Sequence, residues 1–291
     1  MDSGTNLSAV IGFPTPTPAN PDSVEIEFVT GLLPPSLGAW DKWFLGWLEA
    51  QPAPGAWTEL ALPAVQVLRE DYERYRQFGY AFDEADPQAL IGGVSTREFF
   101  LVENRWVPLG PGELPDSSLA LVRDEQTGVV LYLAGDDPDG GGPLPPRNTG
   151  MYDYFLPDGG LLVWHVNQAR IEPSLADNTI NTDGDGLRLI EADGIQDIGV
   201  LDPYVLGFYG STRDPFHAGR DGSPVTSVAL AQEGAPASRA HDRSWTGFVL
   251  EEISANEAVM TLRAMVAPTA ADGVIELPPY DAADAAALGG Q

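Results

Sequence analysis

Cysteine is absent from this chain of 291 residues, which excludes disulfides, thiolate zinc sites and cysteine nucleophiles. Basic residues are scarce, with 15 lysines and arginines against 43 aspartates and glutamates. The formal net charge of −28 repels phosphate backbones, so we expect no nucleic-acid partner. The acidic excess favours either a solvated acidic surface or carboxylates that hold calcium.

Long apolar runs are also missing. No apolar stretch approaches the roughly 18 residues of a membrane-spanning helix, so the sequence predicts no transmembrane segment. The first residues, Met1–Gly4, have neither the basic region nor the apolar region of a signal peptide.

Familiar catalytic signatures are absent as well. The chain contains no G-x-S-x-G elbow, no phosphate-binding G-x-x-x-x-G-K-[ST] loop, no G-x-G-x-x-G fingerprint and no H-E-x-x-H zinc motif. Its three histidines, His165, His217 and His241, are too far apart to share one helix face. A site assembled from distant segments stays open, because such sites are defined by geometry rather than by order in the chain.

Short apolar runs separated by turn residues dominate the sequence after Pro54 and predict strands. We therefore expect a mainly β fold with a few short helices, of the α+β class. The expected strands are Trp57–Leu62, Arg97–Val102, Leu119–Arg123, Val129–Leu133, Gly160–Val166, Leu187–Glu191, Val225–Leu230, Phe248–Ile253 and Val259–Arg263.

The first 48 residues have a different texture. Residues 1–35 are rich in proline, glycine and serine, which predicts loops with one strand at Val24–Val29. Ser36–Leu48 predicts a short packing helix capped by Ser36. Its apolar face would hold Leu37, Trp40, Phe44, Trp47 and Leu48. Leu68–Phe78 is compatible with a helix or with a polar loop.

These shifts in composition divide the chain into three parts. Residues 1–50 would hold a loop and the packing helix, and residues 51–266 a β-rich domain. An acidic loop insertion rich in glycine and aspartate interrupts that domain at about residues 106–150. Residues 267–291 have the composition of a linker or disordered tail.

The strongest local signal for an ion is Asn181–Gly186, which places oxygens at Asn181, Asp183 and Asp185 before a glycine. The next acidic side chain is Glu191, one position too early for an EF-hand, so an EF-hand does not fit. A calcium loop of another kind and a plain turn both remain open. Asp136, Asp137 and Asp139 form a weaker candidate.

Two further features have structural interpretations as their default. His165 ends an apolar strand, where its ring would bond to backbone or to a neighbouring carboxylate; a metal-ligand role would need partners that the sequence does not identify. Tyr209–Phe216 reads as a surface loop anchored by Phe216.

Five segments together resemble the secreted immune inhibitor A-type metallopeptidases. Order and approximate spacing agree over residues 1–265, apart from 106–150. Leu37–Leu48 resembles their "aW-x-K-x-x-LGWl", Phe99–Arg105 their "yyLvENR", Leu156–Val166 their "LPG-x-GLLIWHvd", Leu189–Gly194 their "L-x-eADG" and Asp214–Phe216 their "DpFpG".

The resemblance implies the β-rich C-terminal part of a zincin, or metzincin-like, hydrolase. In that family a helix with H-E-x-x-H holds the catalytic zinc, and a methionine turn follows it. Met1–Gly4 looks like that turn, so the zinc ligands and catalytic residues would lie upstream of residue 1. The family is secreted and cleaves proteins or peptides, whereas this acidic fragment alone would be a non-catalytic support, stabilised by calcium.

Two other hypotheses compete with this one. The chain could be an extracellular binding or adhesion module that kept the support and lost the protease half. It could also be an unrelated β-sandwich binding domain, because one fold hosts many functions.

Overall fold

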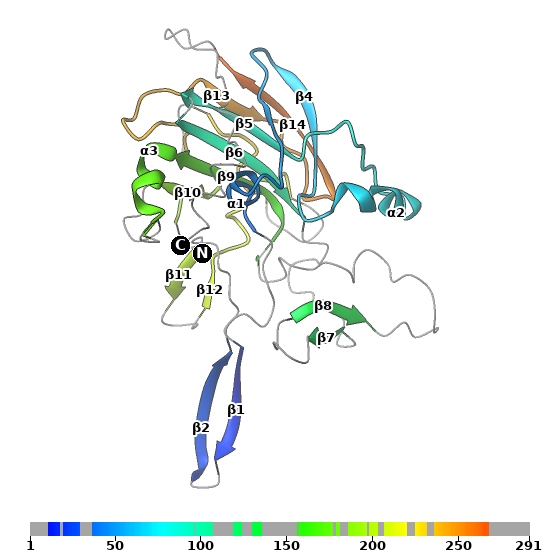
Figure 1. Ribbon diagram of the computed structural model, residues 1–291, viewed down its shortest axis with the longest axis vertical. Coiled ribbons are helices and arrows are strands. Elements are labelled where there is room, and N and C mark those ends of the chain that lie inside the picture. Colours follow the sequence, from blue (N-terminus) through cyan, green and yellow to red (C-terminus); the bar gives the residue numbers. More distant parts are fainter. Residues whose placement is uncertain are drawn as a thin grey trace.

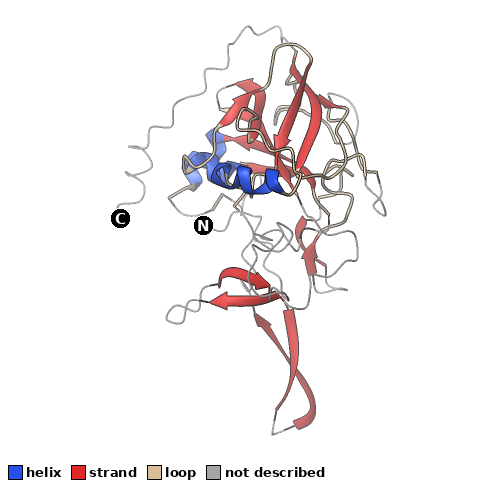
Figure 2. Ribbon diagram, turned by 90° about the vertical axis from the view of Figure 1, so that its right-hand side faces the viewer, coloured by secondary structure: helices blue, strands red, loops and turns tan. Residues whose placement is uncertain are grey.

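The computed structural model describes fourteen stretches of the chain, and everything below concerns them. They are residues 11–17, 20–29, 37–95, 97–106, 119–123, 130–135, 156, 158–176, 179–180, 186–196, 198–202, 207–219, 225–231 and 236–267. Their structure is mainly β with a few short helices, which confirms the predicted class at this level (Figures 1 and 2).

A five-stranded sheet forms the centre of the molecule. Its order is β10 (Leu187–Ile190), β9 (Gly160–Asn167), β6 (Glu98–Arg105), β5 (Ala89–Ser95) and β3 (Ala50–Pro52). All neighbours pair antiparallel except β3 and β5. A second, three-stranded sheet has the order β13 (Phe248–Glu251), β14 (Val259–Val266) and β4 (Thr58–Pro63).

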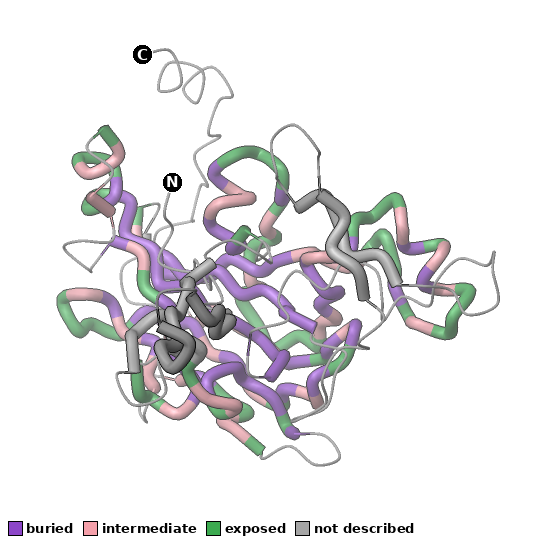
Figure 3. The backbone as a smooth tube through the Cα atoms, turned by 90° about the horizontal axis from the view of Figure 1, so that it is seen from below, coloured by how far each residue is buried: buried purple, intermediate pink, exposed green. Residues whose placement is uncertain are grey.

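The two faces of the central sheet bury different cores, because successive side chains of a strand point to opposite faces. In β6, Phe100 and Val102 join the three-stranded sheet in one apolar core with Phe248 and Leu262. The alternate residues of β6 pack into a second core on the other face. The strands β6 and β9 are buried along almost their whole length. Buried residues, drawn in purple, run through the middle of the molecule (Figure 3).

Helix α1 (Ala39–Phe44) packs against β6 and β9 from the side of the second core. It is shorter than predicted, because Leu45 caps its end and Gly46 then adopts a left-handed conformation with φ of 72°. The helix cap is Gly38, whose N–H donates to the Asp41 carboxylate at 3.2 Å, so the prediction of Ser36 as the cap was wrong.

The predicted apolar face of this segment is only partly buried. Trp40, Phe44 and Leu48 lie in the core, whereas Leu37 and Trp47 are exposed, Trp47 by 69%. Their exposure follows from the short helix: Leu37 precedes it and Trp47 follows Gly46, so neither lies on the buried face.

The remaining elements form smaller units. Pairs of strands build separate hairpins or short ladders: β1 (Ile11–Thr17) with β2 (Asn20–Val29), β7 (Leu119–Arg123) with β8 (Val130–Gly135), and β11 (Ile198–Asp202) with β12 (Gly207–Tyr209). The short helices are η1 (Arg69–Asp71), α2 (Tyr72–Gln77), α3 (Gln168–Ile171) and η3 (Glu172–Ser174). No described helix has the length and apolar character needed to cross a membrane.

Comparison with the sequence gives mixed results. In the central sheet, the strands β5 and β3 were not predicted. Leu68–Phe78 contains the helices η1 and α2, so the helical alternative was right. Val225–Leu230 forms only an isolated bridge at Leu230, so that strand prediction was wrong. The loop prediction was wrong for Ile11–Thr17, which is a strand although it contains two prolines. A two-stranded hairpin consists of edges only, where proline is tolerated.

Candidate functional site

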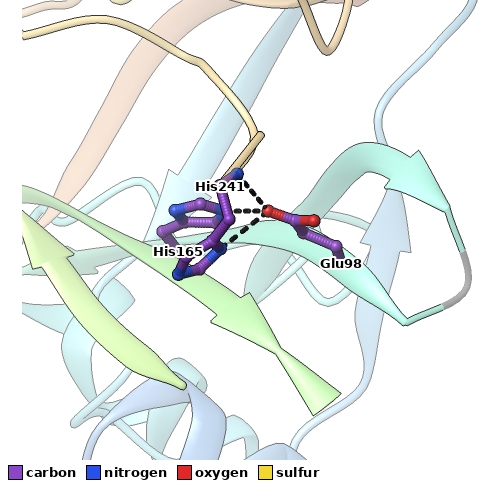
Figure 4. A group of neighbouring side chains, drawn as sticks. All are labelled: Glu98, His165 and His241. Carbon is purple, nitrogen blue, oxygen red and sulfur yellow. Dashed lines mark hydrogen bonds and ion pairs between the residues drawn. The ribbon is translucent and has the colours of Figure 1, made fainter. Parts of the chain in front are cut away.

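The alternation of β6 and β9 brings three side chains to one end of the face that carries the first core. Glu98 and Phe100 lie two residues apart on β6 and therefore share a face. The antiparallel register sets Phe100 opposite His165 of β9, and the two rings stack at 4.7 Å between centroids. His241 approaches from the loop before β13, and its ring lies 4.5 Å from that of His165 (Figure 4).

The Glu98 carboxylate holds both histidines. Its Oε1 atom lies 2.9 Å from His165 Nε2 and 2.8 Å from His241 Nδ1, and it accepts a further bond from the His241 backbone N–H at 2.7 Å. Because an ionised carboxylate only accepts hydrogen bonds, these contacts place the ring proton on Nε2 of His165 and on Nδ1 of His241. The three groups form one hydrogen-bonded unit, named here the Glu98 triad.

The surroundings of the triad favour an ionised Glu98 and a neutral His165. Burial raises the pKa of the Glu98 carboxyl, but the hydrogen bonds from His241 and His165 outweigh it and bring the pKa below its usual value. Burial lowers the pKa of His165, and the neighbouring His241 lowers it further, against a smaller opposing effect of Glu98. At neutral pH the triad therefore pairs an ionised Glu98 with a neutral His165.

The donor set of the triad is one that zinc and similar ions use. One ligand atom from each of Glu98, His165 and His241 lies within 4.8 Å of the others. The ring nitrogens that face Glu98 carry protons donated to it, however, so an ion would have to displace both protons and break both bonds.

A cavity of about 480 Å³ opens beside the triad and includes His165 and His241 in its wall. The wall also contains three arginines: Arg188 of β10, and Arg239 and Arg243 of the loop that carries His241. Among the described residues of the wall, the one carboxylate is that of Glu191, which is 3% exposed and accepts bonds from Gln196 and from the Ile198 N–H, both at 3.1 Å. The cavity is positively charged in a strongly acidic chain.

Only part of the predicted calcium-ligand set lies within the described residues. Asn181, Asp183 and Asp185 lie outside the described residues, as do Asp136, Asp137 and Asp139. Glu191 is described, and the ligand oxygens of Glu191, Asp193 and Asp214 all lie within 4.8 Å of one another.

Hydrogen bonds already use part of this acidic group. Asp214 accepts from the Ser211 N–H at 2.6 Å and from the Ser211 hydroxyl at 2.7 Å. Oxygen ligands of this type suit calcium.

The remaining histidine, His217, lies in a different, fully buried group. Its Nε2 atom is 3.7 Å from Asp158 Oδ2, and its Nδ1 accepts the Gly219 N–H at 2.9 Å. Asp158 also accepts from Asn256 Nδ2 at 3.0 Å. His217 and Asp158 are 0% exposed, and neither belongs to the cavity wall.

The E-N-R part of β6 has a structural role. Glu103 accepts from Trp164 Nε1 at 2.7 Å and pairs with Arg105 at 3.0 Å, both deeply buried. Arg105 also donates to the Leu37 carbonyl at 2.6 Å. Asn104 reaches the other sheet by donating to the Leu62 carbonyl at 2.9 Å. These three residues join α1 and both sheets.

The predicted bond of His165 to a neighbouring carboxylate is confirmed by its contact with Glu98. Phe216 is fully buried, so its predicted role as a loop anchor is confirmed too. Sequence reasoning missed Glu98, His241 and the three arginines. Glu98 could have been found, because its spacing from Phe100 on a predicted strand puts both on one face. His241 and the arginines lie on elements whose approach the sequence does not indicate.

Comparisons of the chain with models of known protein families, with curated proteins and with solved structures find no match.

Proposed function

We propose that this chain is the β-rich, non-catalytic C-terminal part of a secreted zinc metallopeptidase of the immune inhibitor A type. In the intact protein it would support a catalytic domain that cleaves proteins or peptides. The observation behind the proposal is that the five segments resembling this family are joined to one another in the fold, although they are spread over about 180 residues between Leu37 and Phe216.

Direct contacts connect these segments in series. Arg105 of the Phe99–Arg105 segment donates to Leu37, and Glu103 accepts from Trp164. Phe216 and Leu161 exchange two backbone hydrogen bonds at 3.0 Å, and the Ala192 N–H donates to the Asp214 carbonyl at 2.7 Å. These contacts place the five segments in one packed unit, as the proposal requires.

The chemistry of the family would come from outside this sequence. The chain contains no H-E-x-x-H, and the turn-like Met1–Gly4 lies outside the described residues. Sequencing the in-frame DNA upstream of the Met1 codon tests the proposal directly. A frame that encodes H-E-x-x-H shortly before Met1 supports it. An in-frame stop codon there contradicts the truncated-protease form and favours the binding-module alternative.

Activity of the chain itself gives a second test. We expect no cleavage of casein by the purified 291-residue protein, with or without added zinc, because the catalytic glutamate and the zinc helix are absent. Casein cleavage that a chelator abolishes would contradict the non-catalytic assignment. A known zinc endopeptidase assayed in the same buffer serves as the positive control.

Calcium is the cofactor that the acidic residues favour. Glu191, Asp193 and Asp214 supply carboxylates at one place, and the predicted ligands Asn181, Asp183 and Asp185 precede them in the chain. An ion that binds only the folded state raises the melting temperature. We therefore expect a higher Tm in calcium than in chelator, and an unchanged Tm would remove calcium from the account.

A further inference from the structure

We infer that the cavity beside the Glu98 triad binds a small organic anion through a carboxylate group. Arg188, Arg239 and Arg243 line it together with His165 and His241. The inference rests on the charge, the geometry and the size of this cavity. It does not depend on the protease assignment proposed above.

The charge of the wall is the first argument. Three of the 15 basic residues of the chain meet at this one cavity, although acidic residues outnumber basic ones almost threefold. Within the described part of the chain, none of these three guanidinium groups forms an ion pair, whereas Arg76, Arg105 and Arg263 each pair with glutamate. An anion would supply the missing negative charge.

Two of the three arginines, Arg188 and Arg239, are also held in position. Arg188 donates from Nε to Gln196 Oε1 at 2.5 Å, and Gln196 is fixed in turn by the Leu189 carbonyl at 2.7 Å. Arg239 donates from Nη1 to the Arg243 carbonyl at 2.9 Å. Each guanidinium group keeps further N–H donors for a ligand, and a planar fork of this kind matches the geometry of a carboxylate.

The loop that carries Arg239, His241 and Arg243 is tightly closed. Its ends form a bridge between Arg239 and Trp245, and the Arg243 N–H donates to the Ala240 carbonyl at 2.8 Å. Arg243 has a φ of 68°, in the left-handed region that non-glycine residues seldom adopt. Such strain persists where the surrounding structure enforces it, and it is common at binding sites. The loop thus presents its cationic side chains from a defined backbone.

The size and the remaining lining define the class of ligand. A cavity of about 480 Å³ falls in the range of small-molecule sites, roughly 300–1,000 Å³, and is larger than a bare inorganic anion needs. Ile190, Pro236, Ala237 and Ala240 add apolar surface to the charged groups. A carboxylate on a short carbon skeleton satisfies both parts, because the wall offers three arginines against the single described carboxylate of Glu191.

Titration calorimetry with glutarate tests the inference on the whole 291-residue protein. Glutaramide has the same skeleton without charge, and inorganic phosphate is an oxyanion without a skeleton. We expect saturable binding of glutarate that weakens as salt is added, and no binding of glutaramide. Absence of glutarate binding would overturn the inference. Phosphate binding as tight as that of glutarate would overturn the assignment to an organic anion.

Matched variants locate the site. Arg188→Gln and Arg239→Gln each remove charge-assisted hydrogen bonds, so we expect glutarate affinity to fall about tenfold to a hundredfold. Arg213→Gln is the control, because Arg213 is exposed, lies outside the cavity wall and removes the same charge. Equal loss in all three variants would indicate general electrostatics and overturn the site. Circular dichroism spectra identical to wild type show that each variant is folded.

Discussion

Two groups in this protein set histidine against a carboxylate, and they differ in what surrounds them. In the Glu98 triad, two histidines converge on one oxygen at 2.8 and 2.9 Å beside an arginine-lined cavity. In the second group, His217 lies 3.7 Å from Asp158 with no exposed surface on either residue, and Asn256 donates to Asp158 at 3.0 Å. We call this second group the Asp158 cluster.

The difference shows how the same residue types acquire different roles. The Asp158 cluster lies in the interior, where its hydrogen bonds join Asn256 to Asp158 and the Gly219 N–H to His217. The Glu98 triad lies at the end of the same core, where the strands β6 and β9 meet a loop and a cavity opens. Removing a residue should therefore affect stability most in the Asp158 cluster and ligand binding most beside the Glu98 triad.

The largest effect is expected from Asp158→Ala. This change removes the acceptor of the Gly159 and Asn256 bonds and the charge facing His217, all in a fully buried place. Breaking such a group costs about 3 kcal/mol or more of unfolding free energy, because water cannot replace the lost partner. Urea denaturation measures it. A loss below about 1 kcal/mol would contradict the assignment of this cluster as structural.

A smaller loss is expected from Glu98→Ala. The change removes three hydrogen bonds, but the triad is only partly buried and water from the cavity can reach the histidines. We expect a loss of about 2 kcal/mol, again by urea denaturation. Glu98→Gln, which keeps one oxygen as an acceptor, should lose less. If Glu98→Ala destabilised the protein more than Asp158→Ala, the contrast between the two groups would be wrong.

The pH dependence of stability should distinguish the triad further. Because the pKa of His165 is lowered on folding, the unfolded chain takes up a proton first as pH falls below the ordinary value of 6.5. The stability contributed by neutral His165 is therefore complete above that pH and declines below it. The lowered pKa of Glu98 adds a loss of stability at more acidic pH, below 4.5.

In His165→Gln the decline of stability just below pH 6.5 should be weaker. Unfolding curves recorded from pH 7.5 to 5 would measure it. An unchanged slope would contradict this role of His165.

The smallest effect is expected at an exposed ion pair, which gives a baseline for both groups. Arg76 contacts Glu84 at 2.8 Å, and its hydrogen bond lowers the pKa of Glu84 to about 2. Water and salt screen such a pair, so Arg76→Gln should leave the urea midpoint unchanged within error. A shift as large as that of Glu98→Ala would show that surface charge governs stability in this acidic chain.

Part of the central fold could be predicted from the sequence, because β6, β9 and β10 carry clear patterns, whereas β5 and β3 were not predicted. Gly160–Asn167 and Glu98–Arg105 are apolar runs between turn residues, and both lie inside the sheet. Predictions failed where the pairing with a neighbouring strand, rather than composition, decides whether a segment forms a strand. Val225–Leu230 has the composition of a strand but lacks a neighbouring strand to pair with along its length. Ile11–Thr17 contains prolines but pairs with β2 at an edge.

The site was less predictable than the fold. The sequence indicated that His165 would bond to backbone or to a neighbouring carboxylate, but the identity of its partner depends on the register between β6 and β9. A shift of one residue would have turned Glu98 to the opposite face. His241 is 76 positions after His165 and reaches it through a loop without a pattern of its own. Arginines from β10 and this loop meet only because both elements border the same cavity.

The contrast between the two groups can be tested in one experiment, because the chain has only three histidines. NMR spectra of protein labelled at histidine, recorded during a glutarate titration, report on both groups at once. The account predicts that the signals of His165 and His241 move saturably with glutarate while that of His217 stays in place. Three unmoved signals, or a shift of His217 as large as the others, would contradict it.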